Sequence, residues 1–317
     1  MARLVAALAL ALLAGVALAQ YPTRPVRVLI PQPPGGANDT VARVIAPALS
    51  ERLGQPLVIE NRPGANGNQA MEVAAKAPPD GYTLLLAADA QIVINPHFYS
   101  NLPFDTLKDL VPVASVVNTQ MVLAVNPSLP VKTLPEFIDY ARRADPPLAY
   151  ASIGNGSQHH LVMEMLKQRA GINLLHVPYK GGGEAVTSLL SGTTDSYFSA
   201  PIESGQHVKA GKLTLLGASS LKRTPGLADY PTISESGLPG FEVTHYTSLL
   251  VKTGTPPEII AKLSENIVKA VQAPDVREKI AQNGDVPLGT QAEAIELYAK
   301  EYERWPKAVK AANVKPG

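Results

Sequence analysis

Short apolar runs alternate with helical patterns along this chain, and that alternation constrains the fold more than any other feature. Val26–Pro31 is an apolar run, and apolar residues then recur at helical spacing across 41–49. Pro56–Ile59 and Tyr82–Ala87 are further apolar runs, with a short helical pattern over 69–76 between them. Strands and helices that alternate in this order form parallel sheets with right-handed crossovers. The sequence therefore predicts an α/β fold.

The alternation stops after Asp105 and begins again further along the chain. Two extended runs, 110–117 and 121–125, come close together, and a second α/β series follows. Its predicted helices cover 134–143, 158–170, 184–190 and 202–210, and its predicted strands cover 148–152, 174–179, 196–200 and 213–219. The chain has 317 residues, which exceeds the size of about 250–300 residues at which single cores stop growing. Two α/β lobes are therefore expected.

The boundary between the lobes is expected where the chain crosses from one to the other. Residues 221–241 are rich in Pro, Gly, Ser and Thr, which predicts a long irregular crossing. A strand over 246–251 and closing helices, the last over 291–312, complete the chain. We expect the first lobe to combine residues 20–120 with 241–317 and the second to consist of residues 121–240, so that the chain crosses twice.

The first nineteen residues have the pattern of a secretory signal peptide. A basic start, Arg3, precedes an apolar run over 4–18, and Ala17 and Ala19 are the small residues that a signal peptidase recognises. A membrane span needs about 20 apolar residues, and a proline-rich segment follows this run at once, so an uncleaved anchor is the less favoured alternative. We expect cleavage after Ala19, export to the periplasm and no direct membrane anchor.

Composition excludes several classes of function. Lys and Arg number 28 against 27 Asp and Glu, so there is no basic surplus for nucleic acid or anionic lipid. The chain has no cysteine, which excludes disulfides, thiolate metal sites, cysteine nucleophiles and a lipid-anchored form. No Walker loop, His-Glu-x-x-His helix, Gly-x-Ser-x-Gly elbow or complete Gly-x-Gly-x-x-Gly motif occurs. We therefore expect no cofactor, no metal ion and no catalytic residue.

Two glycine-rich loops each join a predicted strand to a predicted helix, one in each lobe. The first spans 31–40 and the second spans 152–160, and neither contains Lys or Arg. The first N–H groups of a helix have no partner within it and carry a partial positive charge, so they bind carboxylate or phosphate. One such loop alone is more often an ordinary connection between a strand and a helix. Two loops at corresponding places favour a shared anion site between the lobes.

The candidate ligand-binding residues come from these loops and from nearby strand ends, where α/β sheets place their ligands. Asp39 is expected to cap the helix with its carboxylate and to offer its backbone N–H. Lys180 is expected either to reach a second carboxylate of the ligand or to remain solvated. The full set is Pro34, Gly35, Gly36, Asn38, Asp39, Ala88, Asp89, Ser152, Gly154, Asn155, Gly156, Ser157, His160, Tyr179 and Lys180.

Other polar and aromatic residues have simpler interpretations beside the functional ones. His159 and His160 are adjacent, so on a helix they point about 100° apart and cannot chelate one metal ion well. Polar residues at a helix start are the favoured interpretation for both. His176 lies in an apolar strand and is expected to be a buried histidine with satisfied hydrogen bonds. Tyr246 is either a cleft aromatic or a core residue.

Seven short motifs follow one another along the chain. They are Tyr21-Pro22-x-Arg24-Pro25-Val26, Pro34-Gly35-Gly36-x-x-Asp39, Glu60-Asn61-Arg62-Pro63-Gly64-Ala65-x-Gly67, Pro79-Asp80-Gly81-Tyr82, Gly154-x-Gly156-Ser157-x-x-His160-Leu161, Val177-Pro178-Tyr179-Lys180-Gly181 and Gly254-Thr255-Pro256. Each motif is modest by itself. In this order, behind a signal peptide, they resemble the periplasmic solute-binding receptors of tripartite tricarboxylate transporters, also called Bug receptors. The resemblance covers essentially the whole chain after residue 19.

The resemblance implies a two-lobed periplasmic binding protein of type II, a flytrap that closes on a small organic acid. In that family the ligand carboxylate is bound largely by backbone groups and ordered waters of two loops, which correspond here to 34–36 with Asp39 and to 154–157. It also implies transient association with integral-membrane transporter subunits. The chain departs from the family at Tyr246, where tryptophan is frequent, and at Lys252, where proline is usual. The ligand specificity does not carry over.

Two other functions remain open from the sequence. One is a ligand-sensing subunit that presents its closed form to a membrane signalling partner. The other is an exported hydrolase or isomerase that uses Asp39, His160 or Lys180. The resemblance favours a carboxylate-binding protein over both.

Overall fold

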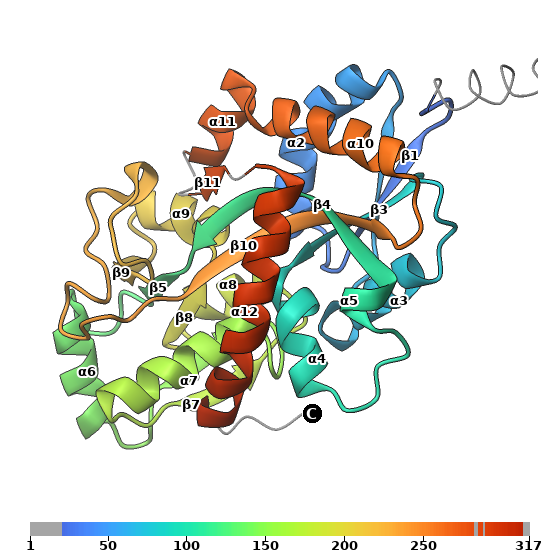
Figure 1. Cartoon of the computed structure of the whole chain (residues 1–317). Coiled ribbons are helices and arrows are strands. Elements are labelled where there is room, and N and C mark those ends of the chain that lie inside the picture. The colour runs from blue at the N-terminus through green and yellow to red at the C-terminus, as the bar shows by residue number, and fades with distance from the viewer. Residues whose placement is uncertain (1–20, 282–284, 288, 313–317) are drawn as a thin grey trace, which may run out of the picture.

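The computed structural model describes residues 21–281, 285–287 and 289–312, and within these ranges the strands form two sheets (Figure 1). The first sheet has the order β11-β4-β10-β3-β1-β2, and the second has the order β7-β6-β8-β5-β9. The first contains β1 (Val26–Ile30), β2 (Leu57–Asn61), β3 (Thr83–Ala88), β4 (Leu110–Gln120), β10 (Thr244–Lys252) and β11 (Asp285–Pro287). The second contains β5 (Val122–Val125), β6 (Ala149–Ser152), β7 (Leu175–Pro178), β8 (Ser196–Ser199) and β9 (Thr214–Ala218). The predicted signal peptide, residues 1–19, lies outside the described residues.

Strand pairing follows the predicted alternation of strands and helices. β1 lies parallel to β2 and β3, and β6 lies parallel to β7 and β8. β10 is antiparallel to β3 and β4, and β5 is antiparallel to β8 and β9. Parallel strands covered on both faces consist largely of apolar residues, and Val26, Val28 and Ile30 of β1 are all buried. The predicted α/β fold is confirmed.

The helices lie near the positions that the periodicity predicts. In chain order, the α-helices are α2 (Ala37–Leu53), α3 (Asn68–Ala75), α4 (Asn95–Phe98), α5 (Thr106–Asp109), α6 (Leu134–Arg143), α7 (Gln158–Ala170), α8 (Gly182–Leu190), α9 (Pro201–Lys209), α10 (Pro257–Val271), α11 (Pro274–Ala281) and α12 (Gln291–Ala312). Single turns of 3₁₀ helix occur at η1 (Ala65–Gly67) and η3 (Pro225–Leu227), and η2 (Ala90–Ile94) is π-helical.

Besides the two single 3₁₀ turns, the segment formed by η2 and α4, the short helix α5 and the strand β11 have no counterpart in the sequence prediction. The segment formed by η2 and α4 begins because the Asp89 carboxylate accepts the backbone N–H of Ala90 (2.8 Å). The following residues Gln91–Ile94 are mostly apolar and buried, so their pattern resembles a continuation of the preceding strand. A single capping side chain within an apolar run is too weak a signal to reveal the turn.

The chain passes between the two sheets at two adjacent places, from β4 to β5 and from β9 to β10. Ser219 joins both passages. Its hydroxyl accepts the N–H of Met121 (2.9 Å) and donates to the carbonyl of Val243, and its backbone N–H donates to the carbonyl of Met121 (2.8 Å). The two predicted crossings are therefore present and are hydrogen-bonded to each other.

The C-terminal helix α12 lies against both parts of the molecule (Figure 1). It contacts β4 of the first sheet and α7, which packs on the second. Tyr298 and Trp305 on α12 are buried, and a large apolar side chain that is fully buried contributes about 1.5–3 kcal/mol. The helix thus connects the two parts by packing, in addition to the two crossings. Among the described residues, no helix combines the length and the hydropathy that crossing a bilayer requires.

Candidate functional site

A cavity of about 540 Å³ lies between segments that belong to the two sheets. One wall is formed by the loop after β1, by the loop 63–67 after β2 and by Gln91, and the other by the loops after β6 and β7. A volume of this size is within the range of small-molecule sites. Its lining residues are Pro31, Gln32, Pro33, Pro63, Gly64, Ala65, Asn66, Gly67, Gln91, Ile153, Gly154, Tyr179, Lys180, Gly181 and Glu184.

The predicted site residues fall into three groups around this cavity. Gly154, Tyr179 and Lys180 line it. A second group is buried next to the lining segments, and a third group is exposed at the loop edges. The buried group is Gly36, Asn38, Asp39, Ala88, Asp89, Ser152, Gly156, Ser157 and His160, and the exposed group is Pro34, Gly35 and Asn155.

Asp39 does not cap α2 in the way that the sequence predicted. Gly36 is the N-cap residue and offers no side chain, and the Asp39 carboxylate instead accepts the N–H of Gly35 before the helix (2.9 Å). Side chains at the third helical position point back towards the N-terminus, which brings this carboxylate to Gly35. Arg43 Nε (2.9 Å) and Asn61 Nδ2 (2.9 Å) donate to the same carboxylate.

The charge of Asp39 is therefore compensated within the loop. Burial disfavours the ionised form, but the hydrogen bonds from Arg43, Gly35 and Asn61 outweigh burial and hold the pKa of Asp39 below its usual value. The carboxylate remains ionised at neutral pH, with Arg43 as its ion-pair partner. It stabilises the first loop without leaving an unpaired negative charge beside an anion site.

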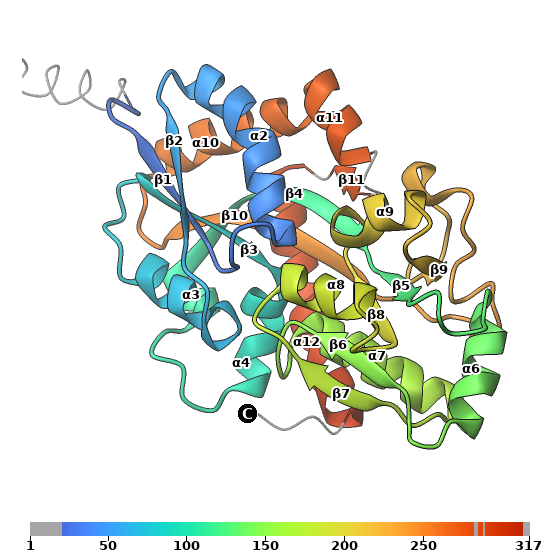
Figure 2. The ribbon, with the colours of Figure 1, turned by 180° about the vertical axis from the view of Figure 1, so that it is seen from behind.

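The start of α2 retains backbone donors for a ligand. The side-chain oxygen of Gln32 accepts the N–H of Asn38 (2.9 Å), and the carbonyl of Gly36 accepts the N–H of Thr40 (2.9 Å). Within the described part of the chain, the N–H groups of Ala37 and Asp39 have no acceptor. This end of α2 also approaches α9, which packs with the second sheet (Figure 2).

The second glycine loop has the same character at the start of α7. Ser157 caps the helix, because its hydroxyl accepts the N–H of His160 (3.3 Å). Gly154 and Gly156 both have positive φ angles, +122° and +71°, which favour glycine. Among the residues that the structure describes, no hydrogen-bond acceptor is found for the N–H groups of Gln158 and His159.

Each part of the molecule contacts the other around the cavity. An alanine Cβ at Gly156 would lie within 2.6 Å of the ring carbons Cδ1 and Cζ of Phe98, which is on α4. A Cβ at Gly181 would lie 3.0 Å from the Cγ of Pro33 in the first loop. Glycine at both positions therefore allows segments from the two parts to approach closely.

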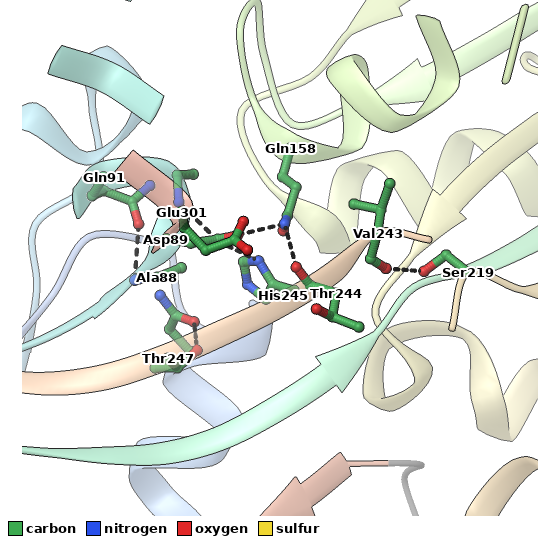
Figure 3. Close-up of polar contacts among 12 residues, drawn as sticks. Ala88, Asp89, Gln91, Gln158, Ser219, Val243, Thr244, His245, Thr247 and Glu301 are labelled. Carbon is green, nitrogen blue, oxygen red and sulfur yellow. Dashed lines mark hydrogen bonds and ion pairs between the residues drawn. The ribbon is translucent and has the colours of Figure 1, made fainter. Parts of the chain in front are cut away.

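Asp89, predicted as a ligand contact, is fully buried in a polar link between the two parts (Figure 3). Its carboxylate accepts Gln158 Nε2 from the start of α7 (2.6 Å) and lies 2.8 Å from His245 Nδ1 on β10. Gln158 Nε2 also donates to the carbonyl of Thr244 (3.2 Å). Asp89 thus joins the end of β3 to α7 and β10 and does not line the cavity.

Ala88, the other predicted strand-end residue, does not line the cavity itself but is hydrogen-bonded to Gln91, which does. Its N–H donates to Gln91 Oε1 (3.1 Å), and Gln91 Nε2 donates to the carbonyl of Asn66 (3.0 Å). Gln91 and Asn66 both line the cavity. Ala65 and Asn66 have positive φ angles, +48° and +52°, so this hydrogen bond helps to fix an unusual loop conformation.

The loop 63–67 and Gln91 are lining segments that the site prediction missed. The sequence does carry a signal for the loop, since Pro63, Gly64 and Gly67 belong to one of the seven motifs. Tyr246, left open between cleft and core, is buried and stacks on Tyr298 with 5.6 Å between ring centroids. Lys252 forms an ion pair with Asp109 (2.8 Å).

The charged residues that line the cavity are Lys180 and Glu184. The Glu184 carboxylate accepts the backbone N–H of Lys180 (3.1 Å). The Lys180 side chain is exposed and makes no ion pair with any described residue. Its ammonium group is therefore available to a second polar end of a ligand.

Comparison with known protein families shows which family this chain belongs to. The model of the tripartite tricarboxylate transporter family receptor matches residues 41–314. The chain belongs to this family. A protein from the tcbD-tcbE intergenic region of Pseudomonas sp. strain P51 is 36% identical over 313 residues, which cover 97% of this chain and 93% of that protein. Protein BugT of Bordetella pertussis is 35% identical and is covered to 91%, with 93% of this chain aligned.

Solved structures of family members have the same fold. Rpa4515 of R. palustris with adipate superposes with a TM-score of 0.90 at 32% identity and covers 94% of this chain and 100% of its own. MatC of Rhodopseudomonas palustris with bound malate gives a TM-score of 0.84 at 31% identity, with 91% of this chain and 100% of that chain covered. The periplasmic binding protein BugD gives 0.87 at 31% identity, covering 93% and 99%. The predicted two-lobed periplasmic binding protein fold and the predicted family are both confirmed.

Proposed function

We propose that this chain is an extracytoplasmic solute-binding protein that captures a small carboxylate between its lobes and delivers it to the membrane subunits of a tripartite tricarboxylate-type transporter. The observation that carries the proposal is the 540 Å³ cavity, bordered by the two glycine loops that lead into α2 and α7. Both helix starts keep N–H groups without an acceptor in the described residues. We assign the lobes to residues 20–120 with 241–317 and to residues 121–240.

The chemistry of capture follows from these backbone donors. The N-terminus of a helix stabilises an anion by about 0.3–1 kcal/mol when exposed and up to about 2 kcal/mol when partly buried. Hydrogen bonds from N–H groups to a carboxylate add about 1.5–3 kcal/mol each. A few such bonds give useful affinity without a buried salt bridge. The site then releases its ligand readily, as delivery to a transporter requires.

The proposed binding residues have different parts in this scheme. The N–H groups that lack an acceptor, those of Ala37 and Asp39 at the start of α2 and of Gln158 and His159 at the start of α7, receive the carboxylate directly or through water. Tyr179 and Ile153 provide apolar surface for the body of the ligand, since both line the cavity. Lys180 binds a second polar group when the ligand has one.

Family relatives support a carboxylate as the ligand. Rpa4515 is described with adipate and MatC with malate, and both share the fold of this chain at more than 30% identity. The contacts of Asp39 with Arg43 and of His160 with Gly156 give these side chains structural partners, which weighs against the hydrolase or isomerase alternative. We propose no catalytic step and no cofactor.

Export completes the proposal. Residues 1–19 have the sequence pattern of a signal peptide, and we propose that cleavage after Ala19 releases the chain into the periplasm without a membrane anchor. Mass measurement of the protein recovered from the periplasmic fraction tests this directly. A mass that still contains residues 1–19 would contradict it.

The binding proposal is tested by a thermal-shift panel of mono-, di- and tricarboxylates and aromatic acids, with adipate and malate included. A ligand at about one hundred times its Kd stabilises the folded state by about 2.7 kcal/mol, which shifts the melting temperature by several degrees. Adipamide is the matched control, because it has the length of adipate without the charge. Stabilisation by no acid in the panel, or equally by adipate and adipamide, would refute the proposal.

A further inference from the structure

Two histidine rings stack directly beneath the second glycine loop. His160 on α7 and His176 on β7 have ring centroids 3.7 Å apart with planes inclined by 14°. The ring of Tyr150 on β6 lies beside both histidines, with its centroid 5.0 Å from that of His176 and 6.2 Å from that of His160. His160 is buried and His176 is partly buried. The two histidines, called the histidine pair below, lie on separate elements that meet only in the folded lobe.

One ring of the histidine pair is hydrogen-bonded to a glycine of the loop, and the other is linked to a second glycine through Ser152. His160 Nδ1 accepts the N–H of Gly156 (3.1 Å). His176 Nε2 lies 2.6 Å from Ser152 Oγ, and the same hydroxyl oxygen accepts the N–H of Gly154 (3.1 Å). The pair therefore fixes the directions of both glycine amides, directly at Gly156 and through Ser152 at Gly154.

We propose that the histidine pair is a positioning element that sets the geometry of the second glycine loop, and through it the affinity for a carboxylate, and that protonation of His160 disables it. The inference rests on the proposed function for its link to affinity. The effect on loop geometry stands on the hydrogen bonds alone. Neither histidine contacts the ligand in this scheme.

The role requires the His160 ring to be neutral. His160 Nδ1 accepts a hydrogen bond from the N–H of Gly156, so its lone pair must be free and the ring proton must sit on Nε2. A protonated ring would present N–H to N–H at Gly156. It would also place a cation 3.7 Å from the second ring.

The surroundings of the histidine pair keep it neutral at ordinary pH. Burial lowers the pKa of His160 to about 3, and the proximity of His176 and Lys167 acts in the same direction. Burial lowers the pKa of His176 to about 4, opposed by Glu164 and assisted by Lys167. The Tyr150 hydroxyl donates to Glu164 (2.6 Å), and Lys167 pairs with the same carboxylate (2.7 Å). The loop contacts the apolar ring of Phe98 on its other side, which adds no charge.

Two substitutions at one position separate the hydrogen bond from simple packing. His160→Asn keeps an acceptor, since its Oδ1 occupies nearly the place of Nδ1 but does not titrate in this range. His160→Leu fills similar space without an acceptor. The matched control is His207→Asn on α9, a partly exposed histidine outside the loop.

The first measurement is hydrogen exchange of the Gly156 amide in the ligand-free protein at pH 7. Loss of one hydrogen bond is expected to accelerate exchange roughly three- to tenfold in His160→Leu. His160→Asn and His207→Asn are expected to stay close to the wild type. Equal protection of Gly156 in the wild type and His160→Leu would overturn the inference, and so would equal losses in the Leu and Asn variants.

The second measurement is the affinity for adipate and malate by calorimetry between pH 7 and pH 3. His160→Leu is expected to bind roughly three- to tenfold more weakly at pH 7, with affinity rescued in His160→Asn. Below pH 4 the wild type is expected to lose more affinity than His160→Asn at the same pH, because the variant lacks the ring that titrates near 3. Comparison at one pH cancels the protonation of the acids themselves. If no acid binds the wild type, the proposed function fails while the exchange data still decide the role of the pair. If acids bind the wild type and His160→Leu equally, only the positioning role fails.

Discussion

Replacement of Gly156 by alanine tests whether the second loop closes against α4 when a ligand is bound. The new Cβ would lie within 2.6 Å of two ring carbons of Phe98, closer than real Cβ atoms approach other atoms. The φ angle of Gly156, +71°, is also unfavourable for alanine. The substitution therefore has two separable costs, one local to the backbone and one that involves the opposite lobe.

The two costs are distinguished by a matched control. Gly171 at the end of α7 has a φ of +61° and open space where a Cβ would be, so Gly171→Ala has the backbone cost alone. That cost is about 1–2 kcal/mol in both variants. Crowding in a packed site adds about 1–3 kcal/mol. Phe98 lies on α4, between strands of the first sheet, and Gly156 precedes α7, between strands of the second. We therefore expect the crowding to act only on a form in which these two parts are closed together.

Urea unfolding and calorimetry with adipate or malate measure the two costs. Both variants are expected to lose about 1–2 kcal/mol of unfolding free energy. Only Gly156→Ala is expected to lose affinity as well, by about 5- to 150-fold for 1–3 kcal/mol. In a Phe98→Ala background, Gly156→Ala is expected to change the affinity little, since the ring is gone. An equal loss of affinity with and without the Phe98 ring would refute the reasoning.

Two further predictions concern buried polar groups. The free energy of unfolding is expected to fall as the pH is lowered from about 6.5 towards 4, because the unfolded chain protonates its histidines near 6.5, whereas folded His176 and His160 do so only near 4 and 3. The unfolded state binds more protons in this window, so the free energy of unfolding rises with pH. Urea titrations of a His160→Asn/His176→Gln variant should show a weaker dependence of this free energy on pH. The same dependence in the variant and the wild type would contradict the lowered pKa values of the two histidines. Gln158→Leu removes the hydrogen bond that Gln158 Nε2 donates to Asp89, which joins α7 to the end of β3. It is expected to weaken binding about 10- to 150-fold by calorimetry, given about 1.5–3 kcal/mol for a hydrogen bond to a charged group. Gln168→Leu, exposed on the same helix, is the control, and equal effects of the two substitutions would count against the link.

Most of the fold follows from hydrophobic periodicity. Strands β1–β3 and β5–β10 and the helices α6 and α7 begin and end within about two residues of their predicted bounds, and β4 extends three residues beyond its predicted end. Strong alternation identifies element type well. The sequence analysis did not predict β11, because three residues carry little periodic signal. It did not predict the helical segment from Ala90 to Phe98, because this segment depends on one capping carboxylate, Asp89.

The two glycine loops beside the cavity were predictable from the sequence, and their hydrogen bonds were not. The two glycine loops were recognised from Gly36 and Gly156 because anion sites favour the starts of helices that follow strands. The hydrogen-bond partners of their amide groups were not predicted. The side chain of Gln32 accepts the N–H of Asn38, and that of Asp39 accepts the N–H of Gly35, only in the folded loop. Such hydrogen bonds between side chains and the backbone depend on side-chain rotamers, which cannot be inferred from the sequence.

Ser219 has a consequence for any movement that would accompany the proposed capture and release. Its hydrogen bonds to Met121 and Val243 couple the two connections between the sheets, so we expect them to bend and twist together. We then expect opening to be close to a single rotation about one axis, with α12 limiting its amplitude because it packs on both parts. One pair of spin labels, one on each side of the axis, is consequently enough to follow the whole motion.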